Sequence, residues 1–210
     1  MKKNYETELP DEYTCVLHIN AADKKFGWIF NLIALGVFIL VLAVVLPTAN
    51  YKAFSFSPDD LDSLFLLTIT LFSFCIAMLV YLVLHELAHG VAYKALTKQK
   101  LKFGLTWSCA YCGVPDIFVY RKTALIALLV PFVLFTLLLA PLTVWAGIVG
   151  SIAYIPLGAL FGLHLGGCSG DLYMTGLLLF RYKDSDTLIR DKGAETFFFI
   201  KNENDKIKEK

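Results

Sequence analysis

Charged residues are scarce in this chain, and neither sign of charge dominates. Asp, Glu, Lys and Arg make up 18% of the 210 residues, whereas soluble proteins usually contain about 25%. The net charge is only +1, which gives no reason to expect nucleic acid as a partner. Five cysteines, an odd number in a chain of this length, do not suit a disulfide-bonded scaffold. Hydrophobic residues reach 57%, which excludes disorder for most of the chain and disfavours a soluble globule.

Long runs without any charge indicate the class of protein. A helix needs about 20 apolar residues to cross the hydrocarbon core of a bilayer. Formal charges are absent from residues 26–51, from residues 63–84 and, with His164 neutral, from residues 123–170. The third run is long enough for two crossings, with a glycine-containing turn near residue 148. We therefore predict an α-helical polytopic membrane protein with four transmembrane helices, at about residues 27–47, 62–94, 122–146 and 151–181.

The distribution of basic residues predicts the orientation of these helices. Of the 19 lysines and arginines, all but Lys52 fall before the first span, between the second and third, or after the fourth. Because cytoplasmic loops are rich in these residues, we predict a multi-pass protein of the cell (cytoplasmic) membrane with both termini in the cytoplasm. Its parts are a cytoplasmic leader (1–26), a membrane domain (27–181) with a cytoplasmic loop (95–121), and a cytoplasmic tail (182–210).

The polar segments carry patterns typical of short strands. Apolar and more polar residues alternate over residues 101–107, a turn is expected at 112–116, and residues 117–120 form the return strand of a small cytoplasmic β-hairpin. Residues 187–200 predict a second hairpin, and residues 13–19 a further strand. The first hairpin either lies on the lipid headgroups or dips toward the helices with an edge open to an extended peptide.

The strongest functional signal is a charged motif inside the second predicted span, because charge within a bilayer is costly. His85-Glu86-Leu87-Ala88-His89 has the pattern H-E-x-x-H. Positions i and i+4 of a helix share a face about 6 Å apart, so the two histidines can hold one Zn²⁺ at about 2.0–2.1 Å. Glu86 then lies beside the metal, where it can accept a proton from water. The alternative is a buried polar cluster that joins helices.

Catalytic zinc usually has a third protein ligand, and Asp171 is the candidate at a matching depth. His85 lies nine residues before Lys94, at the end of the second span. Asp171 lies ten residues before Arg181, at the end of the fourth. At 1.5 Å per residue, both are about 14 Å inside the membrane. The alternative for Asp171 is a carboxylate that caps a broken helix.

Two further features leave several roles open. His164 lies seven residues before Asp171, about 10 Å along a straight helix, with the glycine-rich segment 166–170 between them. It can be a metal ligand, a hydrogen-bond donor to an oxyanion during catalysis, or a partner of a backbone carbonyl. Cys109 and Cys112 form a C-x-x-C pair, which is either half of a structural zinc site or a pair of free thiols.

These motifs resemble the site-2 protease superfamily of intramembrane zinc metalloproteases, and more closely a family of small bacterial zincin membrane peptidases. Residues 85–90 and 164–171 carry the resemblance, which covers about residues 60–200. It implies that the histidines of the first motif bind zinc, that its glutamate is the general base, and that Asp171 replaces the aspartate of the superfamily's Asp-Gly motif. The chain departs from that pattern, because glycine precedes Asp171, no Asn-Pro-Asp-Gly occurs and there is no PDZ-like insert.

Motif and resemblance together predict an intramembrane zinc endopeptidase. The predicted metal ligands are His85, His89 and Asp171, and the predicted catalytic residues are Glu86 and His164. The expected partners are a membrane-protein or peptide substrate and the lipid bilayer. Two alternatives use the same residues without hydrolysis: a zinc-binding membrane scaffold, and a carrier of metal ions or protons. The charge-free runs on the outer side of spans two to four offer Thr68, Thr70, Ser73 and Thr136 but no charged residue, which counts against a carrier.

The orientation can be tested with reporter fusions. A reporter active only in the cytoplasm should be active after Lys210 and inactive within residues 53–60, because the basic residues predict opposite sides for these segments. A C-terminal reporter that is active only outside the cell would contradict the four-span arrangement.

Overall fold

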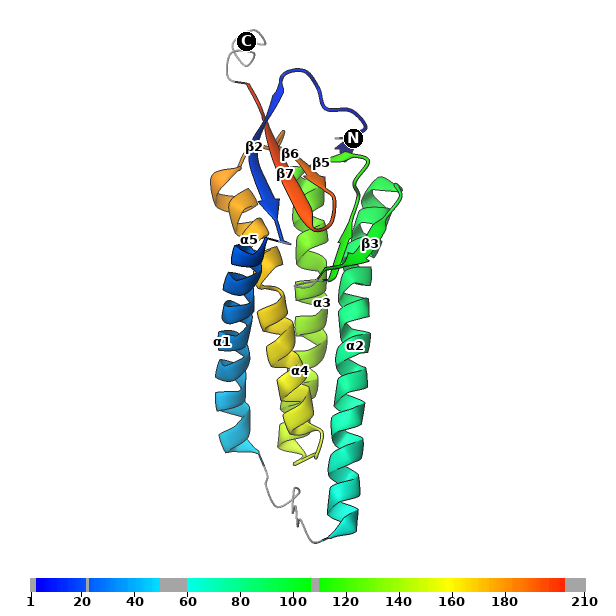
Figure 1. Ribbon diagram of the computed structural model, residues 1–210, viewed down its shortest axis with the longest axis vertical. Coiled ribbons are helices and arrows are strands. Elements are labelled where there is room, and N and C mark those ends of the chain that lie inside the picture. The colour runs from blue at the N-terminus through cyan, green and yellow to red at the C-terminus, as the bar shows by residue number, and fades with distance from the viewer. Residues whose placement is uncertain (1–2, 22, 50–59, 107–109, 203–210) are drawn as a thin grey trace. The chain divides into compact units, whose positions relative to one another are not determined.

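A computed structural model describes residues 3–21, 23–49, 60–106 and 110–202. The chain is mostly helical, with two small antiparallel sheets (Figure 1). It forms two compact units, and the chain passes between them several times. The first unit consists of Met1–Phe30, His85–Pro131 and Gly170–Lys210, and the second of Asn31–Leu84 and Phe132–Ser169.

Within the described part of the chain, three helices are long and apolar enough to cross a membrane. They are α1 (Lys24–Thr48), α2 (Leu61–Thr97) and α3 (Arg121–Ile148). Each coincides with one of the first three spans expected from the charge-free runs. The sequence therefore identified these helices correctly, because a long apolar run without breaks favours a helix that satisfies its own backbone hydrogen bonds.

The fourth expected span, at about residues 151–181, is not one continuous helix. It is divided into α4 (Tyr154–Gly167), α5 (Ser169–Gly176) and the π-helical turn η2 (Leu177–Arg181). The first break is at Cys168, directly after two glycines, which are poor helix formers. The number of transmembrane spans therefore remains a prediction.

Most strands belong to one five-stranded antiparallel sheet of the first unit, in the order β1-β5-β6-β7-β2. The expected tail hairpin is confirmed as β6–β7, and Gly193 in its turn has a φ of +91°, a conformation that favours glycine. The expected strand at 13–19 is confirmed as β2. The strand bounds are β1 (Tyr5–Glu6), β2 (Tyr13–Asn20), β5 (Phe118–Tyr120), β6 (Leu188–Asp191) and β7 (Glu195–Lys201).

The expected hairpin of the loop is paired differently from the prediction. β3 (Lys102–Leu105) pairs with β4 (Ala110–Gly113), so the return strand comes earlier than residues 117–120. Residues 118–120 are β5, which pairs with β1 and β6 in the larger sheet. Alternation in one segment does not specify its partner, and these partners are more than 60 residues away in the sequence. The tip of the β3–β4 hairpin, residues 107–109, lies outside the described residues.

The core of the first unit joins the sheet to the helices beside it. Fully buried side chains meet there from α3 (Ala127), η2 (Leu178), β5 (Val119) and β7 (Phe198), and Tyr93 of α2 belongs to the same cluster. Burying a large apolar side chain stabilises a fold by about 1.5–3 kcal/mol. This packing joins the sheet to α2 at Ala92 and Tyr93.

In the second unit, glycines of α4 allow α1 to approach closely. A Cβ atom at Gly166 would lie 2.6 Å from the carbonyl oxygen of Ala34, and one at Gly158 would lie 2.7 Å from the side chain of Val45. Contacts of this kind, in which small residues let two backbones meet, are typical of apolar helix pairs in membranes.

Candidate metal centre

The H-E-x-x-H motif lies within the unbroken helix α2, so His85 and His89 point the same way, one turn apart. Their ring centroids are 5.1 Å apart and both side chains are buried. Leu, Glu and Ala, which favour helix, occupy the positions between and beside them. The helix thus presents two imidazoles side by side, as the spacing of the motif predicts.

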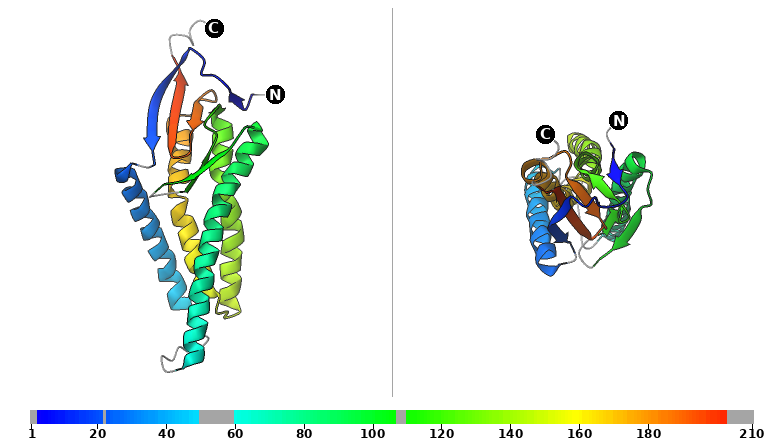
Figure 2. Two further views of the ribbon diagram at one scale, coloured as in Figure 1. Left: turned by 45° about the vertical axis from the view of Figure 1, so that its right-hand side comes forward. Right: turned by 90° about the horizontal axis from the view of Figure 1, so that it is seen from above.

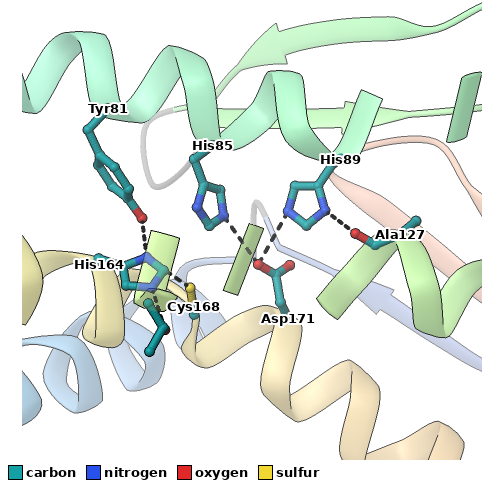
Figure 3. A network of polar contacts seen from close by, with 8 residues as sticks. Tyr81, His85, His89, Ala127, His164, Cys168 and Asp171 are labelled. Atoms are coloured by element: carbon teal, nitrogen blue, oxygen red, sulfur yellow. Dashed lines mark hydrogen bonds and ion pairs between the residues drawn. The ribbon is translucent and has the colours of Figure 1, made fainter. Parts of the chain in front are cut away.

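Asp171 reaches the two histidines from the first turn of α5. Its Oδ2 atom lies 3.3 Å from Nε2 of His85 and 3.3 Å from Nε2 of His89 (Figure 3). All three residues belong to the first unit. The structure therefore brings together the three residues that the sequence proposed as metal ligands, although their binding of a metal remains a prediction.

The protonation of His89 shows what this arrangement requires. Its Nδ1 atom is 2.8 Å from the carbonyl oxygen of Ala127 in α3. A carbonyl only accepts hydrogen bonds, so Nδ1 carries the proton, and Nε2 of neutral His89 presents a lone pair to the Asp171 carboxylate. Two acceptors 3.3 Å apart repel each other unless a cation, either a proton or a metal ion, lies between them.

The three side chains fit Zn²⁺. Donors held at about 2.0–2.1 Å in tetrahedral geometry are separated from one another by about 3.3 Å, which matches the two distances from Asp171 to the histidines. Two imidazole nitrogens and one carboxylate oxygen are also a usual donor set for catalytic zinc with an open fourth position. The hydrogen bond from His89 to Ala127 orients the ring in the way that histidine ligands of metals are usually held.

Glu86 lies beside this group without forming part of it. It follows His85 on α2, and one residue corresponds to a rotation of about 100° around the helix. Its side chain is half-buried, and its charge is within electrostatic range of His85, His89 and Asp171. The position suits a residue that contacts water or substrate at the centre, and the role of general base remains a prediction.

His164 lies in the second unit, where polar groups surround both of its ring nitrogens. Its Nδ1 is 2.9 Å from the hydroxyl of Tyr81 and its Nε2 is 3.0 Å from Oγ1 of Thr136 (Figure 3). The ring is fully buried and is surrounded by Phe132, Phe135 and Phe161. Hydroxyl groups contact both ring nitrogens, Sγ of Cys168 lies 3.6 Å from Nδ1, and the roles considered for His164 remain predictions.

The sequence analysis missed Tyr93 and Asp191, which extend the polar network of the first unit. Tyr93 is one turn beyond His89 on α2, and its hydroxyl donates to Oδ2 of Asp191 at 2.7 Å. Burial raises the pKa of Asp191 to about 6, although hydrogen bonds from Tyr93 and Gly193 act in the opposite direction. The i+4 spacing from His89 could have drawn attention to Tyr93, whereas no signal marked Asp191.

The C-x-x-C pair is only partly described. Cys112 is buried, and a Cβ atom at Gly90 would lie 3.2 Å from its Sγ. Cys109 lies outside the described residues. Both interpretations of the pair, half of a structural zinc site or two free thiols, therefore stay as predictions.

The fold and the centre define a mostly helical protein with a zincin-type arrangement of histidines and a carboxylate. A family model described as "Putative zincin peptidase" matches residues 78–185, about half of the chain, and the chain belongs to this family. The match includes both histidines, Glu86 and Asp171. No curated protein and no solved structure matches the chain. The family points to a zinc metallopeptidase, and membership of the wider site-2 protease superfamily remains a prediction.

Replacement of Asp171 tests the ligand set. Asp171→Ala should lower the affinity for zinc by at least about tenfold. Loss of a residue that only supports a metal ligand typically lowers metal affinity by about 10–100-fold, and loss of a ligand itself should cost no less. Metal analysis of the protein purified in detergent measures the effect, with His164→Ala as a control from the second unit. Full zinc occupancy in Asp171→Ala together with depletion in His164→Ala would assign the third ligand to His164.

Proposed function

We propose that this protein is an intramembrane zinc metalloprotease that hydrolyses peptide bonds in or near transmembrane segments. The observation that carries the proposal is the position of the Asp171 carboxylate oxygen, 3.3 Å from Nε2 of both His85 and His89. The family match to zincin peptidases supports the same class of reaction.

Several features support a location in the membrane. In the most apolar windows of α1 and α2 only 6% of residues are buried inside the protein, so these helices expose surfaces that suit lipid better than water. The lengths of the long apolar helices suit membrane spans. The positions of 18 of the 19 basic residues support four spans with both termini in the cytoplasm. Under this arrangement, the metal centre lies within the bilayer near its cytoplasmic side.

The residues of the centre have distinct tasks in this proposal. His85, His89 and Asp171 hold the metal and leave one position open. Zinc bound there would polarise the scissile carbonyl and make water a better nucleophile at neutral pH. Glu86 accepts a proton from the attacking water and then returns it to the leaving amine. His164 remains a candidate for hydrogen bonding to the oxyanion, and Tyr81 and Thr136 hold its ring in one orientation.

The β3–β4 hairpin is a suitable surface for the substrate. A transmembrane helix must unwind before its peptide bonds can be cleaved, and the exposed backbone then needs hydrogen-bond partners. Among the described residues, β3 pairs with β4 alone, which leaves its other edge open. Phe103 and Leu105 on this strand are 50% and 82% exposed and can contact apolar substrate side chains. An extended segment would therefore add to β3 as another strand.

Glu86→Gln tests the reaction itself. The amide keeps the shape of the side chain but does not accept the proton, so cleavage should fall by about 10²–10⁴-fold while zinc is retained. Cleavage can be followed by expressing the protein with a panel of tagged single-span membrane proteins and looking for shortened fragments. Metal analysis of the same variant gives the zinc content.

Three outcomes would contradict the proposal. Cleavage by Glu86→Gln at the wild-type rate would remove Glu86 from the mechanism, and if no tested protein is shortened even by the wild type, a zinc-binding scaffold becomes the better description. Loss of zinc from Glu86→Gln to the same extent as from His85→Ala would make Glu86 a ligand.

A further inference from the structure

Tyr93 continues the face of α2 that carries the metal-binding motif. It lies four residues after His89, so it is one turn further along the same face. Its side chain is buried in the apolar core of the first unit, where its hydroxyl donates a hydrogen bond of 2.7 Å to Oδ2 of Asp191. An ionisable pair in such a core is costly unless it is well hydrogen-bonded. The other contacts of Asp191 therefore indicate the role of the pair.

Asp191 joins three separate parts of the first unit. Its Oδ2 accepts from Tyr93 of α2, and its Oδ1 accepts from the backbone N–H of Gly193 in the β6–β7 turn at 2.8 Å. Its backbone carbonyl accepts from the N–H of Val114, directly after β4, at 2.9 Å. One residue therefore holds the metal-binding helix, the β6–β7 turn and the end of the β3–β4 hairpin together.

The hairpin also contacts the metal-binding helix directly, next to a proposed ligand. Gly90 follows His89, and a Cβ atom at this position would lie 2.9 Å from Cζ of Phe103 in β3. A Cβ atom at Gly113 in β4 would lie 2.5 Å from the backbone nitrogen of Gly193. The helix, the hairpin and the β6–β7 turn are thus in contact at positions that have no room for a side chain. In the left view of Figure 2, the green strands of the hairpin run beside the upper end of α2.

We infer that Tyr93 and Asp191 are positioning residues, which set the position of the open β3 edge relative to the metal centre. They thereby determine which peptide bond of the substrate is presented to the metal centre. This inference rests on the proposed protease function and on the addition of substrate to β3. Neither residue touches the ligands in the described contacts, so their loss should move the hairpin and leave the metal bound. Removing the Tyr93 hydroxyl deletes one of the links without altering the backbone.

Hydrogen–deuterium exchange of the full-length, zinc-loaded protein in detergent tests the link without any substrate. Tyr93→Phe and Asp191→Ala should speed exchange in peptides that cover residues 102–106, 110–114 and 191–195 by about tenfold, because a hydrogen bond to a charged group is lost. Asp191→Asn still offers an oxygen and an amide to its neighbours and should largely restore protection. Tyr120→Phe is the matched control, since it removes the 2.8 Å bond from Tyr120 to Glu6 elsewhere in the same sheet.

Kinetics then tests the positioning role. With any substrate that the wild type cleaves, Tyr93→Phe should raise KM about tenfold with a smaller change in kcat, because the edge that binds the peptide is displaced while the reacting groups remain. Zinc content and the absorption spectrum of the Co²⁺-substituted protein should match those of the wild type. Tyr120→Phe should leave KM unchanged.

Several results would overturn the inference. Unchanged hydrogen–deuterium exchange and unchanged KM in Tyr93→Phe would do so, as would loss of zinc from this variant. Exchange in Asp191→Asn as fast as in Asp191→Ala would also contradict it. If Asp191→Ala does not fold, Tyr93→Phe decides. If the wild type cleaves no substrate, the proposed function fails by itself, and the exchange data still decide whether the pair holds the hairpin.

Discussion

The arrangement of the first unit depends on one carboxylate that faces two imidazoles. The proton on Nδ1 of His89 is committed to the carbonyl of Ala127, so the nitrogen that faces Asp171 either carries a second proton or offers its lone pair to a metal ion. In a mostly apolar setting, a carboxylate and two imidazoles held this close together are stable only when a cation lies between them. Binding of a metal would therefore also hold α5 against α2, and the fold of this unit would be coupled to its ligand.

The elements around the centre come from distant parts of the chain. The leader, the central loop and the tail each give strands to one sheet, whose core includes Ala92 and Tyr93 of α2. The family match spans residues 78–185 and includes the centre and the β3–β4 hairpin, whereas β6 and β7 lie beyond it. Asp191, at the end of β6, thus links the matched segment to a part of the chain outside it.

The sequence predicted the elements better than their connections. The three long helices, β2 and the β6–β7 hairpin follow from local patterns of charge and alternation, which act over a few residues. The pairing of β5 was not predicted, and a break in the fourth span was considered only as an alternative, in which Asp171 caps a broken helix. Pairing of β5 with β1 and β6 depends on contacts across more than 60 residues, and the break depends on how glycine-rich backbone is packed, which composition alone does not reveal.

The sequence by itself predicted which residues form the candidate metal centre. The charged H-E-x-x-H motif in an apolar run predicts which face of the helix carries the two histidines. Counting residues from the basic ends of the spans predicts that Asp171 and His85 lie at the same depth in the membrane. Only the tertiary structure decided that Asp171 approaches both histidines equally, that hydroxyl groups contact His164, and that Asp191 joins the helix to the hairpin. The physical reason is that helical periodicity is local and regular, whereas contacts between elements depend on the packing of side chains that are far apart in the chain.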